Sequence, residues 1–244
     1  MKLSLRLSLL AIAVASICCS VALLYYFGVL KYNNPSLTQY PVRGVDVSSY
    51  QGDINWEILS QQSIAFAFIK ATEGSSSVDR CFEINFNNAL QTDLRVGAYH
   101  FFSFDSSGET QADNFIANVP KARATLPPVV DFEFYADKKK NPPNPYNLRE
   151  ELNILLNRLE NRYEVKPIIY ATKESYNLYL SGYYDGYDIW VRSVFTAPKS
   201  FENQSWTFWQ YTNRERLDGY KGTERYIDMN VFNGTADEFS NYAK

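Results

Sequence analysis

Short apolar runs alternate with longer segments of helical period along most of the chain. The apolar runs are rich in Val, Ile, Phe and Tyr and predict buried strands at 44–48, 66–72, 96–102, 127–134, 167–172, 188–193, 208–212 and 227–232. Segments between the first five runs have the period of amphipathic helices, most clearly at 147–163. This alternation predicts an α/β fold in which helices cover a parallel sheet.

The connections between the last three predicted strands lack a helical period. They contain Gly, Pro, Asn and Asp, which favour loops. A chain of 244 residues is long enough for one barrel of β/α units. We therefore expect a modified TIM-like β/α barrel of eight strands, with helices lacking around the last three.

An uncharged apolar run extends from Leu7 to Leu30 and ends at Lys31. It is long enough to cross a bilayer, which takes about 20 residues, and this length favours an uncleaved anchor over a cleaved signal peptide. Lys2 and Arg6 precede the run, which places the N-terminus in the cytoplasm by the positive-inside rule.

These features divide the chain into three parts. Residues 1–31 are expected to be a single-pass membrane anchor or signal segment, 32–42 a short polar linker, and 43–244 the barrel domain. The barrel would then lie on the periplasmic or extracellular side of the cytoplasmic membrane, and would be secreted if the N-terminal segment were cleaved.

Composition excludes several classes of function. The formal net charge is −3 and no long basic run occurs, so no nucleic-acid partner is expected. His100 is the one histidine, which argues against a His-rich zinc site. Cys18 and Cys19 lie in the apolar N-terminal run and leave Cys81 without a partner, so no disulfide framework is expected.

Acidic residues recur where the predicted strands end. In a β/α barrel the carboxyl ends of the strands meet at one mouth, where such folds carry their chemistry. The acids in question are Asp46, Glu73, Asp131, Glu133 and Asp228.

Asp131 and Glu133 form the strongest pair among these acids. They are two residues apart on one strand, so both side chains point to the same side, into the barrel. Two carboxyls close together in an apolar strand repel and lose hydration, which raises the pKa of one of them. A carboxylic acid kept protonated in this way can give a proton to a glycosidic oxygen. Asp46 and Asp228 are weaker candidates, because an isolated strand Asp equally suits a structural hydrogen bond.

Further residues at strand ends are candidates for binding. Glu73 could bind a ligand or be a solvated loop residue, and His100 could orient a ligand or be a satisfied polar group in the barrel. Tyr170 and Trp209 could offer aromatic faces to a sugar, although core packing explains each of them as well.

Seven ordered segments together resemble glycoside hydrolase family 25, the lysozymes of the Chalaropsis type. The resemblance covers nearly all of residues 42–234 and rests on GVDVSSYQGDINW, FAFIKATEG, GAYHFF, PPVVDFE, PIIYAT, FWQYT and IDMNVFNG. It implies a β/α barrel that lacks regular helices around its last three strands. It also implies hydrolysis of the β-1,4 bond between N-acetylmuramic acid and N-acetylglucosamine in peptidoglycan glycan strands, without a metal or organic cofactor.

The resemblance also implies roles for individual residues. It places the general acid at Glu133, the assisting carboxylate at Asp131, and two further active-site aspartates at Asp46 and Asp228. The assisting carboxylate would position the substrate's own N-acetyl group for attack at the anomeric carbon. One departure is Arg192, a large cation where the family usually has a small residue, which could narrow a subsite or pair with an acid.

Two alternatives to a muramidase stay open at this point. A catalytically silent module could bind peptidoglycan in the same groove, although all four candidate acids are present. A chitinase-like glycosidase also ends its fourth strand in acids, but its pattern has an Asp two residues before Asp131, where this chain has Val129.

Overall fold

Eight strands close into a barrel in the computed structural model, which describes residues 2–121, 126–198 and 205–243. Neighbouring strands pair in chain order, and the first strand pairs with both the second and the last, which closes the sheet. This confirms the modified TIM-like barrel expected from the sequence. The strands are β1 (Arg43–Val47), β2 (Phe66–Glu73), β4 (Arg95–Phe101), β5 (Val129–Phe132), β6 (Ile168–Thr172), β7 (Ile189–Arg192), β8 (Phe208–Glu215) and β9 (Ile227–Phe232).

The last strand departs from the parallel sheet that was expected. β9 runs antiparallel to both β8 and β1, whereas the other neighbouring barrel strands are parallel. The connection between β8 and β9 is therefore a hairpin, and a hairpin needs no crossover helix. Because β9 runs in the opposite direction, its first residues lie at the end of the barrel where the other strands finish. A short strand, β3 (Ser77–Val78), pairs with the end of β2 outside the barrel.

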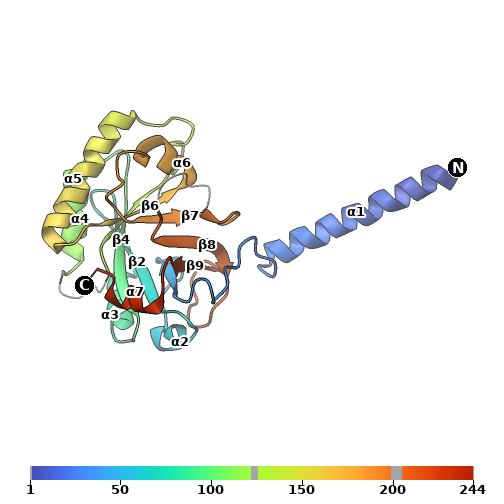
Figure 1. Cartoon of the computed structure of the whole chain (residues 1–244), viewed down its shortest axis with the longest axis horizontal. Coiled ribbons are helices and arrows are strands. Elements are labelled where there is room, and N and C mark those ends of the chain that lie inside the picture. Colours follow the sequence, from blue (N-terminus) through green and yellow to red (C-terminus); the bar gives the residue numbers. More distant parts are fainter. Residues whose placement is uncertain (1, 122–125, 199–204, 244) are drawn as a thin grey trace.

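Helices cross between the early strands and cover the outside of the barrel (Figure 1). Three of them begin at an asparagine or serine whose side chain accepts a hydrogen bond from the first turn, namely Asn55, Ser107 and Asn144. The helices are α2 (Trp56–Ser60), α3 (Phe82–Ala89), α4 (Gly108–Asn118), α5 (Pro145–Tyr163), a short α6 (Lys173–Ser175) with a π-helical turn (Tyr176–Leu180), and α7 (Ala236–Asn241).

Aromatic side chains fill the part of the barrel interior that lies beneath the mouth. Phe68 packs against Trp190 at a ring-centroid distance of 4.7 Å, and Phe66 and Phe208 complete the stack. Gly44 makes room for this stack, because a Cβ there would lie 2.4 Å from the Phe66 ring. Above the aromatic layer the inward-facing residues become polar and charged, so the mouth is a polar site on an apolar floor.

Helix α1 (Lys2–Tyr26) projects away from the barrel as a single rod (Figure 1). Within the described residues, one helical segment, Arg6–Tyr26, is both long enough and apolar enough to cross a membrane. It is not buried against the domain. The segment after it lies against the barrel. Lys31 forms an ion pair with Glu215, and Asn33 donates a hydrogen bond to the Ser193 carbonyl oxygen at 2.9 Å.

Candidate active site

Four carboxyl groups from three strands meet at the mouth of the barrel. Asp46 comes from β1, Asp131 from the end of β5, Glu133 from the residues just after it, and Asp228 from the start of β9. All four line two adjoining hollows of about 320 and 210 Å³. The sequence placed these acids at one mouth, and the structure brings them together there.

Asp46 and Asp228 are held by a shared amide. Gln210 Nε2 donates to Asp46 Oδ1 at 3.0 Å and to Asp228 Oδ2 at 3.0 Å. Asn230 Nδ2 also donates to Asp46 Oδ1 at 2.7 Å, and Trp190 Nε1 fixes that amide by donating to Asn230 Oδ1 at 2.8 Å. The two aspartates are thus positioned by a network that leaves little freedom to either carboxyl.

Burial is the main reason that the pKa of each carboxyl at the mouth is raised. For Asp228, burial and then the nearby Asp46 raise the pKa well above its ordinary value, while Asn230 and Gln210 partly offset the same effect on Asp46. Asp46 and Asp228 also face each other across the sheet, and the charge of Asp46 raises the pKa of Asp228. Ionisation of both carboxyls at once is therefore disfavoured.

Asp131 and Glu133 form a second pair with different exposure. Burial, followed by the charge of Glu133, raises the pKa of Asp131 well above its ordinary range, and burial also raises the pKa of Glu133. Asp131 is almost fully buried, whereas Glu133 is partly exposed in the mouth. Asp131 Oδ1 is shielded from solvent and has no hydrogen-bond partner among the described residues, which leaves one carboxylate oxygen unsatisfied beside the hollow that Asp131 lines.

Two cations border the acids. Lys70 lines the larger hollow and Arg192 lines the smaller one, and the charge of each lowers the pKa of Asp131 and Glu133 against the effect of burial. Lys70 Nζ also pairs with Glu73 at 2.7 Å. Arg192 keeps its own charge although burial alone would lower its pKa, because Tyr170 and Glu133 raise it. The site therefore combines acids of raised pKa with fixed positive charge.

Tyr170 lines the smaller hollow but is buried, so its role as an aromatic face for a sugar stays a prediction. Its hydroxyl donates to Gln210 Oε1 at 3.1 Å, and its ring packs edge-on against Trp190 at 4.8 Å. Tyr170 therefore fixes the amide that joins Asp46 and Asp228.

Three of the predicted binding residues lie outside the two hollows, namely His100, Trp209 and Glu73. His100 points out of the barrel toward α4, where its Nε2 donates to Gln111 Oε1 at 3.1 Å and the Thr72 hydroxyl donates to Nδ1 at 2.7 Å. Trp209 also points outward, and its Nε1 donates to the Ser193 carbonyl at 2.9 Å. Strand alternation is the reason, because Tyr99 and Gln210 take the inward positions beside them.

Glu73 lies at the rim. Its side chain is 48% exposed and is paired with Lys70, so it lines neither hollow. A register shift in β2 between Lys70 and Thr72 displaces the end of this strand from strict alternation. The sequence contained no sign of that irregularity.

Several residues of the site were not identified from the sequence. They are Lys70, Tyr99, Gln210 and Asn230. Asn230 lies two residues after Asp228 on β9, so alternation along the strand is the signal that could have found it. Tyr99 and Gln210 instead alternate with the outward-facing His100 and Trp209, and Lys70 has the opposite parity to Glu73. Within the described residues, no group of three or more His, Cys, Asp or Glu side chains is arranged to hold a metal ion.

Comparison with known proteins assigns the barrel to a family. The family model for glycosyl hydrolases family 25 matches residues 45–220, which is most of the chain and includes Asp46, Asp131 and Glu133. The chain belongs to glycosyl hydrolase family 25. It is therefore a glycoside hydrolase, as its resemblance implied, and the four acids lie at the mouth of a family 25 barrel.

Individual relatives agree with this assignment. A family 25 glycosyl hydrolase from Bacillus anthracis is 54% identical, with a TM-score of 0.83 over 88% of this chain and 98% of that one. The bacterial lysozyme of Streptomyces coelicolor is 34% identical, with a TM-score of 0.67 over 81% and 94% of the two chains. Lysozyme M1 of Streptomyces globisporus is 36% identical over 80% of this chain and 69% of its own.

Proposed function

We propose that this family 25 enzyme hydrolyses the β-1,4 bond between N-acetylmuramic acid and N-acetylglucosamine in peptidoglycan. Lysozymes from two Streptomyces species are among its relatives, which supports bacterial cell-wall glycan as the substrate class. One observation supports the chemistry most directly. Asp131 and Glu133 lie side by side in a polar hollow, and burial raises the pKa of both.

Glu133 acts as the general acid in this proposal. It has the longer side chain of the two and is partly exposed in the mouth, where a glycosidic oxygen can reach it. Burial raises both pKa values, which favours retention of a proton on the pair, and either carboxyl can carry it. A donor that approaches the Asp131 carboxylate from the hollow favours the ionised form of Asp131 and so places the proton on Glu133.

The N–H of the substrate's acetamido group supplies that donor. Its hydrogen bond to the Asp131 carboxylate turns the acetamido carbonyl oxygen toward the anomeric carbon, which this oxygen attacks while Glu133 protonates the departing oxygen. The glycosidic bond breaks as the oxygen–carbon bond of a cyclic oxazolinium intermediate forms. Water then opens the intermediate, and Glu133 accepts its proton. Asp46 and Asp228, held by Gln210, bind the sugar at the far wall.

Digestion of purified peptidoglycan by the full chain in detergent tests this function. New N-acetylmuramic acid reducing ends, identified by mass spectrometry, are expected from the wild type. Glu133→Gln should lower the rate by about 10²–10⁴-fold, the usual contribution of a general acid. Glu73→Gln is the matched control, because Glu73 lies at the rim outside both hollows.

Two results would contradict the proposal. Reducing ends of N-acetylglucosamine would assign cleavage to the other glycosidic bond of the strand. Intact glycan bound equally well by the wild type and by Glu133→Gln would instead identify a silent wall-binding module.

We further propose that α1 stays attached and anchors the enzyme in the cytoplasmic membrane as a single span, with the barrel outside. Its length and hydropathy support this topology, as do the contacts of Lys31 and Asn33 with the barrel. The intact mass of the protein from the membrane fraction tests it. A chain beginning at Met1 is expected, and a mature chain lacking α1 would show a cleaved signal peptide.

A further inference from the structure

Three arginines on the β8–β9 hairpin gather at the end of α1. The guanidinium of Arg214 donates to the Tyr26 carbonyl oxygen at 2.9 Å, and that of Arg216 donates to the Phe27 carbonyl oxygen at 3.1 Å. Arg225 lies over the Phe27 ring at 5.8 Å. We call Arg214, Arg216 and Arg225 the arginine cluster; it lies where the candidate membrane span ends, beside β8 and β9 (Figure 1).

The arginine cluster is rich in cationic charge that no carboxylate neutralises directly. Among the ion pairs of the described residues, none joins Arg214, Arg216 or Arg225 to an acid, and the neighbouring Glu215 pairs with Lys31 instead. Each guanidinium has five N–H donors, so donors remain on Arg214 and Arg216 after their contacts with the carbonyl oxygens of Tyr26 and Phe27. A planar guanidinium with free donors matches the oxygens of a phosphate group.

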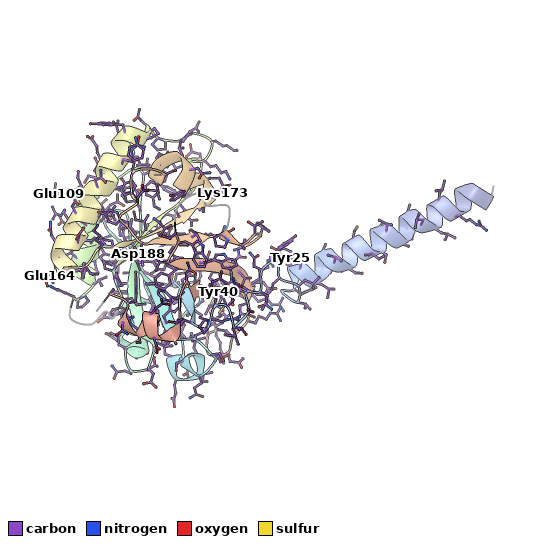
Figure 2. The ribbon with its side chains drawn as sticks, in the orientation of Figure 1. Tyr25, Tyr40, Glu109, Glu164, Lys173 and Asp188 are labelled. Carbon is purple, nitrogen blue, oxygen red and sulfur yellow. The ribbon has the colours of Figure 1, made fainter. Side chains whose placement is uncertain are left out.

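Aromatic side chains surround the same place. Tyr25 lies under Arg214 at 4.9 Å, and Figure 2 marks Tyr25 where α1 meets the domain. The Tyr226 hydroxyl donates to the Tyr26 carbonyl oxygen at 2.8 Å. Tyr32 and Phe195 pack in a T-shaped arrangement nearby and are 62% and 61% exposed. Aromatic rings beside arginines at the end of an apolar span are typical of the level of lipid head groups.

The hairpin that carries the arginine cluster is fixed to the mouth of the barrel. Glu224 N–H donates to the Tyr50 carbonyl oxygen at 3.0 Å, and Gln51 Nε2 donates to the Tyr226 carbonyl oxygen at 3.2 Å. Gly222 permits this close approach, because a Cβ there would lie 1.9 Å from the Tyr50 carbonyl oxygen. Glu224 and Tyr226 also line the larger hollow with Asp131 and Glu133. Any surface to which the β8–β9 hairpin binds will therefore also lie close to the mouth of the barrel.

We propose that the arginine cluster binds the phosphate head groups of anionic phospholipids and so holds the mouth of the barrel beside the membrane surface. The inference rests on the proposed anchor, which brings the cluster to the head groups. Anionic lipid attracts each basic residue near its surface, and removing one such residue lowers the ratio of docked to free domain about fivefold. The enzyme would then cut glycan that lies close to the membrane.

Energy transfer from tryptophan to a dansyl-labelled lipid tests the proposal with the full chain in nanodiscs. All four tryptophans, Trp56, Trp190, Trp206 and Trp209, belong to the barrel domain, so the transfer reports how close the domain lies to the bilayer. Transfer should be higher with phosphatidylglycerol present than in phosphatidylcholine alone. The difference should disappear in the triple variant Arg214→Gln, Arg216→Gln, Arg225→Gln.

The matched control removes three positive charges from α5, on the side of the domain away from α1 (Figure 1), through Arg149→Gln, Arg158→Gln and Arg162→Gln. This variant should keep the dependence on phosphatidylglycerol. A second measurement needs no variant, because NaCl of about 0.5 M shortens the Debye length to about 4 Å and should abolish the wild-type difference.

Three outcomes would overturn the proposal. They are an unchanged lipid response in the triple variant, an equal loss in the α5 control, and a wild-type difference that withstands salt. If the triple variant lost binding to soluble poly(glycerol phosphate) but kept the wild-type lipid response, the arginine cluster would instead be assigned to binding an anionic wall polymer. Failure of the full chain to cleave peptidoglycan in detergent would refute the proposed function and leave the lipid result standing.

Discussion

Asp46 and Asp228 lie directly opposite each other across the antiparallel pair of β1 and β9. Like charges at opposite positions destabilise a sheet, so two ionised aspartates could not occupy this pair at low cost. Gln210 bridges them from β8 by donating to both carboxyls, and the raised pKa of each favours the neutral form, which reduces the repulsion. The antiparallel last strand thus produces an acid pair that an all-parallel barrel would place differently.

Replacing Gln210 should disturb stability and activity together. Gln210→Leu removes the donor to Asp46 and Asp228 and leaves both with unsatisfied buried oxygens, which costs about 1–3 kcal/mol for each group. Urea unfolding and glycan hydrolysis by the same sample measure both effects. Trp209→Phe, the next residue along the strand but outward-facing, should leave hydrolysis unchanged. Equal activity in Gln210→Leu and the wild type would show that the bridge has no part in the reaction.

Asp228 should make the protein less stable as the pH rises. Its pKa is raised by burial above the ordinary value of 3.8, so its protonated form stabilises the fold below about pH 4. That contribution is lost as the pH rises from there through the folded pKa. Asp228→Asn, which resembles the protonated acid, should flatten this part of the pH profile of unfolding. A variant that loses stability with pH as steeply as the wild type would contradict the assignment.

His100 should have the opposite pH dependence. Burial lowers its pKa from 6.5 to about 4, so the unfolded chain takes up the proton first and stability falls as the pH drops through that window. The loss should total about 3 kcal/mol, since one pKa unit corresponds to about 1.4 kcal/mol. His100→Gln should reduce the loss between pH 6.5 and 4 and keep glycan hydrolysis. A strong rise in KM in this variant would show that His100 contributes to substrate binding.

Arg192 should set the alkaline limit of activity. Its charge lowers the pKa of Glu133 against the effect of burial, so Arg192→Ala should raise that pKa and move the alkaline limb of the pH profile of kcat/KM upward. Arg149→Ala, on α5, removes the same charge at a distance and should leave the limb in place. An unmoved limb in Arg192→Ala would show that Arg192 does not act on the acid.

The order of strands and helices could be predicted because burial imposes clear periods on the sequence. The side of a strand to which an individual side chain points was harder to predict, because both sides of these strands are apolar. Trp209 and Gln210 are both buried, and so are Tyr170 and its neighbours, so hydrophobicity did not distinguish the inside of the barrel from the side beneath the helices. Counting alternate positions from the inward Asp228 would have selected Asn230, whereas β8 has no inward acid from which Gln210 could be counted.

The direction of the last strand was not visible in the sequence either. An apolar run such as residues 227–232 has the same pattern in either direction, and the loop before it carries no helical period. Asp228 reaches the mouth only because β9 runs antiparallel and begins there. The acid was therefore placed correctly although the strand direction was expected to be parallel.

Closure of the barrel by its two terminal strands has a consequence for biogenesis. β1 pairs with β9, whose residues are more than 180 positions later in the chain, so these contacts form only after nearly the whole chain is available. With the proposed N-terminal anchor, the domain would emerge from the translocation channel with β1 first and β9 last. Asp46 and Asp228 would then meet only at the end of export, so we expect activity only after the last strand has crossed the membrane.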